Sequence, residues 1–208
     1  MGKENYNKKL LVEGNDDKHV IFALCEKFSI TENFDVIDCK SKESVIEKMP
    51  IYLKTSDIEI IGLIIDADCD IFDSYKSICS KLSNIGYKLP NILPKEGLIL
   101  SEPDKVKIAI WIMPNNKING MLEDFIAFLI PQDDKLPPLI DDFLNTIEEK
   151  KLNKYKPIHR AKTFIHSYLA VQEDPGTPMG LAITKRYLTT DEKNCLNLIN
   201  WLKKTFRD

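Results

Sequence analysis

The sequence lacks long apolar runs and contains few arginines. No stretch approaches the roughly 20 apolar residues that a membrane-spanning helix needs, and the segment MGKENYNKK contains no apolar signal region. Only three arginines are present among the 29 basic side chains, and the formal net charge is −3. This charge argues neither for nor against a polyanionic partner. We expect a cytoplasmic protein that has no membrane association.

Several common catalytic and metal-binding patterns are also missing. The five cysteines are odd in number and show no C-x-x-C spacing, which argues against disulfides and against a structural zinc site. We therefore expect buried free thiols in a reducing compartment. There is no glycine-rich phosphate loop, no nucleophile elbow and no Ser-His-Asp order. These absences exclude the nucleotide-binding and hydrolase classes that such motifs define.

Strand and helix patterns alternate in the first half of the chain. Apolar runs at Lys9–Val12, Phe34–Cys39 and Glu59–Ile65 predict strands, and helical periodicity follows each of them. The third run is almost continuously apolar, which is typical of a strand buried on both faces. This order predicts a parallel sheet with right-handed crossovers. Gly97–Ser101 and Val106–Met113 then predict a β-hairpin.

The last third of the chain is expected to be mostly helical. We therefore predict an α/β fold in a single domain, residues 1–208, with an α/β core over residues 1–130. Residues 131–208 are predicted to form a mainly helical extension packed on that core. Asn15 or Asp16 is expected to cap the first helix, and Thr189 with Glu192 has the pattern of a capping box opening the last helix.

Two acidic clusters follow predicted strands. In LLVEGNDD, Glu13 comes directly after the first strand and Asp17 four residues later, whereas in IIDADCD the third strand leads into Asp66, Asp68 and Asp70. The ligand crevice of an open α/β sheet lies beyond the carboxyl ends of its strands. Carboxylates placed so densely disfavour one another's ionised form unless a cation is present. We therefore predict a divalent-metal site between these strand ends.

Several of these acidic residues also have a structural interpretation. Asp16 and Asp70 lie where helices begin, and Asp70 is more readily explained as a helix cap than as a ligand. Asp66 and Asp68 alternate, so an extended backbone would point both to the same side, where Mg²⁺ accepts carboxylate oxygens. Glu123 and Asp124 form a third acidic pair, which is either an exposed helix start or part of a second metal shell.

A later segment, HRAKTFIH, places basic side chains at helical spacing. His159, Lys162 and His166 are separated by three and four residues and share one helix face. A lysine near a metal site stabilises charge that develops on a transferring phosphoryl group. The alternative is a solvated polar stripe, and the spacing does not decide between the two.

These residues resemble the TOPRIM domain of topoisomerases, bacterial primases and OLD-family nucleases. In that family a glutamate ends the first strand and a D-x-D motif ends a later one, as Glu13 in LLVEG and Asp66 with Asp68 in LIIDAD do here. The E-G-x-x-D spacing, which includes Asp17, looks like the OLD-nuclease branch. The resemblance implies a TOPRIM or Rossmann-like, mostly parallel sheet flanked by helices.

The same resemblance implies a catalytic chemistry. One or two Mg²⁺ or Mn²⁺ ions would be held by acidic side chains, with Glu13 and Lys162 in catalytic roles and Lys162 the looser match. The implied metal ligands are Glu13, Asp17, Asp66, Asp68, Asp70 and Glu123. The chain also resembles, almost end to end, a small stand-alone bacterial TOPRIM-related family. It has no topoisomerase tyrosine context, no primase zinc module and no attached ATPase, so any ATPase partner would be another chain.

Two functional hypotheses follow. The first is a metal-dependent nuclease, a phosphodiesterase acting on DNA or RNA. The second is a non-catalytic module of the same fold that binds nucleic acid or a protein in phage defence, which the near-neutral charge and sparse arginine favour. The sequence does not decide whether the substrate is DNA or RNA, or whether cleavage is endonucleolytic or exonucleolytic. A dimer is compatible with it.

Overall fold

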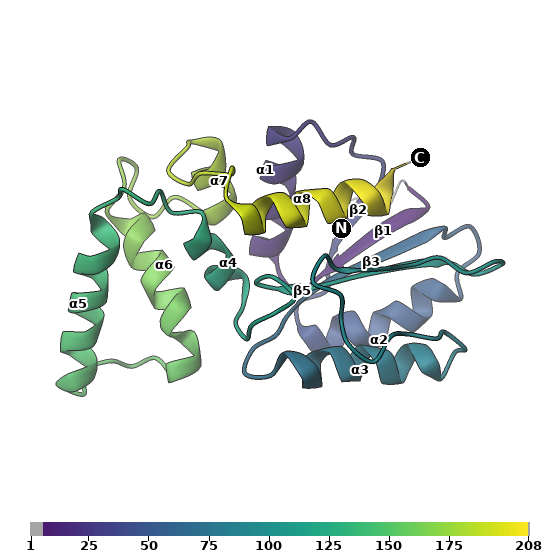
Figure 1. Cartoon of the computed structure of the whole chain (residues 1–208). Helices are drawn as coiled ribbons and strands as arrows, with labels where there is room; N and C mark the ends of the chain where they lie inside the picture. Colours follow the sequence, from purple (N-terminus) through teal and green to yellow (C-terminus); the bar gives the residue numbers. More distant parts are fainter. Residues whose placement is uncertain (1–5, 208) are drawn as a thin grey trace.

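A five-stranded sheet forms the centre of the molecule (Figure 1). The computed structural model describes residues 6–207, so most of the segment on which the absence of a signal region was judged lies outside the described residues. The strand order is β2-β1-β3-β5-β4, in which β4 alone is antiparallel to its neighbour. The strands are β1 (Lys8–Val12), β2 (Asp35–Asp38), β3 (Ile60–Asp66), β4 (Leu98–Leu100) and β5 (Lys107–Met113).

Helices cover both faces of this sheet. The crossover helices are α1 (Asn15–Lys27), α2 (Lys42–Leu53) and α3 (Ile71–Ser83). α1 lies on one face, whereas α2 and α3 lie on the other (Figure 1). In the plane of the sheet, β2 lies on one side of β1 and β3 lies on the other, so the strand order reverses direction after β2. This reversal makes the space between the carboxyl ends of β1 and β3 the switch point, where α/β folds bind ligands.

The remaining helices occupy the face that α1 covers and extend beyond the edge of the sheet. They are α4 (Leu122–Phe128), α5 (Leu136–Glu149), α6 (Arg160–Ala170), α7 (Met179–Thr184) and α8 (Lys193–Phe206), with a 3₁₀ turn at Pro157–His159. α8 lies over the sheet, whereas α5 and α6 form an arm at one side of the molecule (Figure 1). The expected α/β architecture, with its hairpin and helical C-terminal part, is confirmed.

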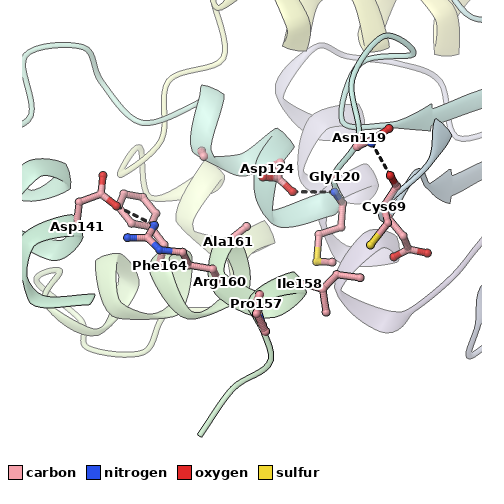
Figure 2. Close-up of a pocket in the computed structure, with 13 residues that line it drawn as sticks. Cys69, Asn119, Gly120, Asp124, Asp141, Pro157, Ile158, Arg160, Ala161 and Phe164 are labelled. Atoms are coloured by element: carbon pink, nitrogen blue, oxygen red, sulfur yellow. Dashed lines mark hydrogen bonds and ion pairs between the residues drawn. The ribbon is translucent and has the colours of Figure 1, made fainter. Parts of the chain in front are cut away.

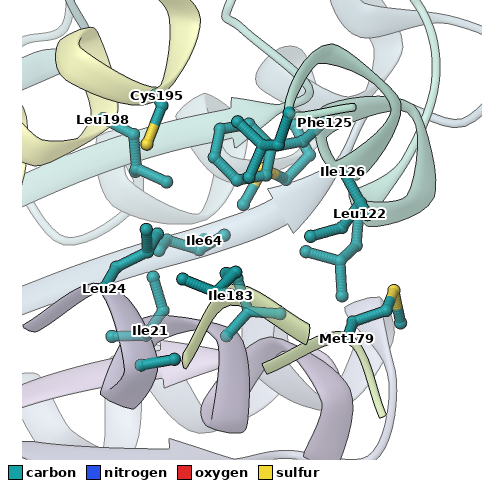
Figure 3. Close-up of a cluster of buried hydrophobic side chains, with 14 of the residues drawn as sticks. Ile21, Leu24, Ile64, Leu122, Phe125, Ile126, Met179, Ile183, Cys195 and Leu198 are labelled. Atoms are coloured by element: carbon teal, nitrogen blue, oxygen red, sulfur yellow. The ribbon is translucent and has the colours of Figure 1, made fainter. Parts of the chain in front are cut away.

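The sheet separates two apolar cores. On the α1 side, Ile64 of β3 packs with side chains of α1, α4, α7 and α8 (Figure 3). On the other side, Leu63 and Ile65 pack against α2 and α3. β3 is therefore buried on both faces, as its continuous apolar run predicted. Trp111 and Trp201 belong to the first core, with ring centroids 5.9 Å apart.

Two predicted helix caps are wrong. α1 begins one residue earlier than expected, with Gly14 at the N-cap, because the side chain of Asp17 accepts a hydrogen bond from the Gly14 N–H. α8 has no capping box that includes Thr189. Glu192 itself is the N-cap, and its carboxylate accepts from the N–H groups of Asn194 and Cys195. Among residues 6–207, no helix is both long and apolar enough to cross a membrane.

Candidate functional site: an acidic cavity at the switch point

A cavity of about 360 Å³ lies at the carboxyl ends of β1 and β3. Its acidic lining residues come from three separate stretches of the chain: Glu13, Asp16, Asp17, Asp66, Asp68 and Glu123. Lys40, His159 and Lys162 also line it. The fold thus brings together carboxylates that lie up to 110 residues apart in the sequence, as the acidic strand ends led us to expect.

Glu13 and Asp66 connect the two strand ends directly. Oε1 of Glu13 accepts a hydrogen bond from the backbone N–H of Asp66 at 2.8 Å. This bond links the residue after β1 to the last residue of β3, across the switch point. The carboxylate of Glu13 is therefore held by the backbone of the neighbouring strand, in the position that a ligand of the crevice would contact.

Two buried carboxylates in the cavity have an unpartnered oxygen. Asp17 is only 7% exposed, and while its Oδ2 accepts from the Gly14 N–H at 3.1 Å, its Oδ1 has no hydrogen-bond partner. Oδ1 of Asp66 is also buried and unpartnered. A buried acceptor without a partner is costly, and such groups in native structures call for an explanation such as a proton or an ion.

The backbone around Asp68 is fixed by a second segment. Asp68 and Gly120 form an isolated antiparallel bridge, with both N–H···O bonds at 2.9 Å. Asp68 has a φ of +54°, so the backbone is not extended there as the sequence argument assumed. Its side chain nevertheless lines the cavity, where it forms an ion pair with Lys42. Lys42 also donates to the Ser74 hydroxyl at 3.1 Å.

Glu123 and Lys162 also line the cavity and form an ion pair with each other. Glu123 is 5% exposed although it lies in the first turn of α4, which rejects the alternative that it is an exposed helix start. Its Oε1 lies 3.3 Å from Nζ of Lys162. The neighbouring Asp124 has a structural role, because its carboxylate accepts a hydrogen bond from the N–H of the N-cap residue Met121 at 2.8 Å and so stabilises the start of α4.

Burial and mutual repulsion make these carboxyls hard to ionise. Burial, opposed in part by the Asp66 N–H, raises the pKa of Glu13 to about 7. Burial and then the charge of Glu13 raise the pKa of Asp17 to about 7. The pKa of Asp66 is raised well above its ordinary value, first by burial and then by the charges of Glu13, Asp17 and Glu123. A cation in the cavity would reverse these shifts.

Not every predicted ligand lies in the cavity. The carboxylate of Asp70 accepts from the N–H groups of Phe72 and Asp73 at the start of α3, so it is placed as a helix cap and does not line the cavity. His166 is exposed and does not line the cavity either, unlike His159 and Lys162. Within residues 6–207, no group of three or more His, Cys, Asp or Glu side chains is already arranged so that it could hold a metal ion.

Sequence reasoning did not find Lys42 or Gly120. Lys42 is one of 29 basic residues, and the sequence distinguishes it from the others only by its position directly after Ser41, the N-cap of α2. Gly120 lies three residues before Glu123, and its φ of +137° explains the glycine, since a Cβ there would also lie 2.6 Å from Oδ2 of Asp124. Both residues hold Asp68 in place, one through its side chain and one through its backbone.

A second and larger cavity adjoins the first. It measures about 590 Å³ and lies between the arm and the loops that follow β3 and β5 (Figure 2). Asp68 and Met121 line both cavities, so the two are neighbours. Ile158 and Arg160 line it from the arm, and Cys69 and Asn119 line it from the core (Figure 2).

The fold and the site together define an α/β protein with a doubly wound sheet and an acidic cavity at its switch point. The chain belongs to the family described as proteins of unknown function, DUF3226, whose model matches residues 7–207. No curated protein and no solved structure matches it. The family match covers the whole described fold and assigns no activity, so function must be argued from the site.

Proposed function

We propose that this protein is a divalent-metal-dependent phosphodiesterase that acts on nucleic acid. The observation that carries the proposal is the pair of buried, unpartnered carboxylate oxygens, Oδ1 of Asp17 and Oδ1 of Asp66, in one cavity at the switch point. The resemblance of LLVEG and LIIDAD to the strand ends of TOPRIM nucleases supports the same chemistry.

The donor set suits a hard cation. Mg²⁺ and Mn²⁺ prefer carboxylate oxygens together with water and phosphate oxygens, and the cavity contains no thiol or paired imidazoles that would favour a softer metal. Asp66, Asp68 and Asp17 would hold one ion, and Glu123 would contribute to a second. When bound, the metal would neutralise the phosphate charge and orient the phosphate for in-line attack.

The protein's own side chains would perform the proton and charge chemistry. Glu13, whose carboxylate is held at 2.8 Å by the Asp66 N–H, would accept a proton from the attacking water. Nζ of Lys162, 3.3 Å from Glu123, would stabilise negative charge that develops on the phosphate oxygens. Lys40, which is largely exposed at the edge of the cavity, would attract the phosphate from solvent.

Calorimetric titration with Mg²⁺ and Mn²⁺, paired with a cleavage assay on labelled DNA and RNA, tests the proposal. The unaltered chain is expected to bind metal at millimolar or lower concentration and to cleave at least one substrate. Asp66→Asn keeps the size of the side chain and removes its charge, so it should lose cleavage by about 100-fold or more while remaining folded. Full cleavage by this variant, or no metal binding by the unaltered chain, contradicts the proposal.

One observation favours a non-catalytic module as the alternative. Asp68 is already paired with Lys42 and Glu123 with Lys162, so two carboxylates of the cavity are neutralised without a metal. A module of this kind would bind nucleic acid or a protein with no metal dependence. The same calorimetric titration separates the two functions, since only the phosphodiesterase requires the metal to compete successfully with these lysines.

A further inference from the structure

We propose that residues 150–162, here called the basic strip, bind the phosphate backbone of a single-stranded nucleic acid and guide it into the acidic cavity. The inference rests on the proposed function, because it names how the substrate reaches that site. The strip connects α5 to the first turn of α6, at the lower end of the arm (Figure 1). Apart from Lys162, neither the resemblance nor the family match assigns a role to residues of the strip.

The charge of the strip differs from that of the chain. It contains no acidic residue, whereas the whole chain has a net charge of −3. Its basic side chains are Lys150, Lys151, Lys154, Lys156, Arg160 and Lys162. A concentration of one sign of charge in one segment of a near-neutral protein is the electrostatic pattern of a surface that binds a polyanion.

Four of these side chains are available to a ligand. Lys150, Lys151, Lys154 and Lys156 are exposed, and no ion pair to them is found among residues 6–207. Arg160 differs, because it pairs with Asp141 at 3.0 Å and with Glu148 and thereby joins α6 to α5. Runs of exposed lysines are common on protein surfaces that bind nothing, so the position of this run relative to the two cavities is the distinguishing observation.

The strip leads into both cavities. Pro157, Ile158 and Arg160 line the cavity of about 590 Å³, and His159 and Lys162 line the acidic cavity. A strand whose phosphates follow the exposed lysines would therefore reach both cavities. Asp68 and Met121 line both cavities, so the two lie side by side along the path that the strip begins.

The larger cavity favours a single strand. Met121, Ile158 and Phe164 give it apolar walls, and its size lies within the range of about 300 to 1,000 Å³ that is typical of small-molecule sites. An unpaired base can enter it without breaking a base pair, whereas a base of a duplex would first have to be unpaired and unstacked, which costs free energy. A basic track next to apolar or aromatic walls is the usual design of proteins that bind single strands.

The test measures binding by fluorescence anisotropy with the full chain in EDTA, so that no cleavage occurs. The probes are a labelled 20-nucleotide single strand and its duplex, each titrated over a series of salt concentrations. The test variant combines four substitutions in the strip: Lys150→Gln, Lys151→Gln, Lys154→Gln and Lys156→Gln. The matched control makes the same charge change at exposed lysines away from the cavities: Lys54→Gln, Lys76→Gln, Lys81→Gln and Lys88→Gln.

For the unaltered chain we expect tighter binding of the single strand than of the duplex. Each phosphate contact adds about 0.7 to the salt slope for single strands, so the strip variant should lose about 2 to 3 from that slope and at least about tenfold in affinity. The control variant should keep the slope within about 1. Circular dichroism should show both variants folded, because the substituted side chains are exposed.

Three results overturn the inference: equal losses in the strip and control variants, equal affinity for duplex and single strand, or equally tight binding of polyglutamate. The last result would mean that the surface recognises any acidic polymer, including an acidic protein. The unaltered chain separates this inference from the proposed function. If it binds the single strand with the expected salt slope in EDTA but fails to cleave when metal is added, the binding surface stands and the phosphodiesterase does not.

Discussion

Oε1 of Glu13 accepts a hydrogen bond from the backbone N–H of Asp66 at 2.8 Å, across 53 positions of sequence. This contact lies where the strand order reverses, and it fixes the distance between the two acidic strand ends. Asp66 thus orients the carboxylate of Glu13 through its backbone while its own side chain retains an unpartnered oxygen. The pair combines a structural hydrogen bond with a buried acceptor that has no partner.

Glu13→Gln and Glu13→Asp separate these two roles. Glutamine keeps an oxygen that accepts from Asp66 but carries no charge, so Mg²⁺ affinity should fall about tenfold or more while thermal stability is retained or increased. Aspartate keeps the charge but is too short to reach the Asp66 N–H, so it should lose stability. Calorimetry and thermal melts check both variants. Equal metal affinity in Glu13→Gln and the unaltered chain would remove Glu13 from the ligand set.

The raised carboxyl pKa values predict that the metal-free protein loses stability as pH rises. Glu13 and Asp17 have folded-state pKa values of about 7, above the values near 4 expected when unfolded, so the folded state binds more protons between these limits. The free energy of unfolding should therefore fall from pH 4 to pH 7 and then level off. A fall of 1 kcal/mol lowers Tm by about 2–4 °C in a chain of this size.

Melts in EDTA from pH 5 to pH 8, repeated with 10 mM Mg²⁺, check this prediction. Protons and metal compete for the same oxygens, so Mg²⁺ should raise Tm more at pH 8 than at pH 5. Asp66→Asn serves as the control, because it removes one of the buried groups and should flatten the profile. A Tm in EDTA that rises steadily to pH 8 would contradict the raised pKa values.

Asp70→Ala distinguishes a helix cap from a metal ligand. The Asp70 carboxylate caps α3 through the N–H groups of Phe72 and Asp73, so the variant should lose about 1 kcal/mol of stability. Asp70→Ser keeps an acceptor at the cap and should recover most of that loss. Mg²⁺ affinity should stay within about twofold in both variants. A tenfold weaker affinity in Asp70→Ser would return Asp70 to the ligand set.

The sequence predicted the parallel sheet and the meeting of its acidic ends, because both follow from local patterns and from the geometry of parallel strands. Glu13 and Asp66 each come directly after a buried run, so their convergence needed no knowledge of packing. Lys42 could not be found in this way. Its role depends on α2 placing its first turn beside Asp68 and Ser74, and nothing in the residues themselves records that contact.

Backbone conformation accounts for the other failures. The D-x-D argument assumed an extended chain through Asp68, whereas the bridge to Gly120 imposes a positive φ there. Gly14 became the N-cap of α1 because the Asp17 carboxylate turns back to its N–H, a contact that capping preferences alone do not reveal. Such contacts depend on tertiary structure, and single-residue preferences are too weak to predict them.

Lys42 supplies the last prediction. Its ammonium group is paired with the Asp68 carboxylate, so it competes with a metal ion for that carboxylate and repels the ion. Lys42→Met should therefore tighten Mg²⁺ binding about 3- to 30-fold. Lys42→Arg keeps the charge and should leave the affinity within about threefold. If Lys42 also orients Asp68 for catalysis, Lys42→Met should bind more metal and cleave more slowly. Calorimetry with each variant gives the affinity, and weaker metal binding in Lys42→Met would mean that holding Asp68 in position matters more than the positive charge next to it.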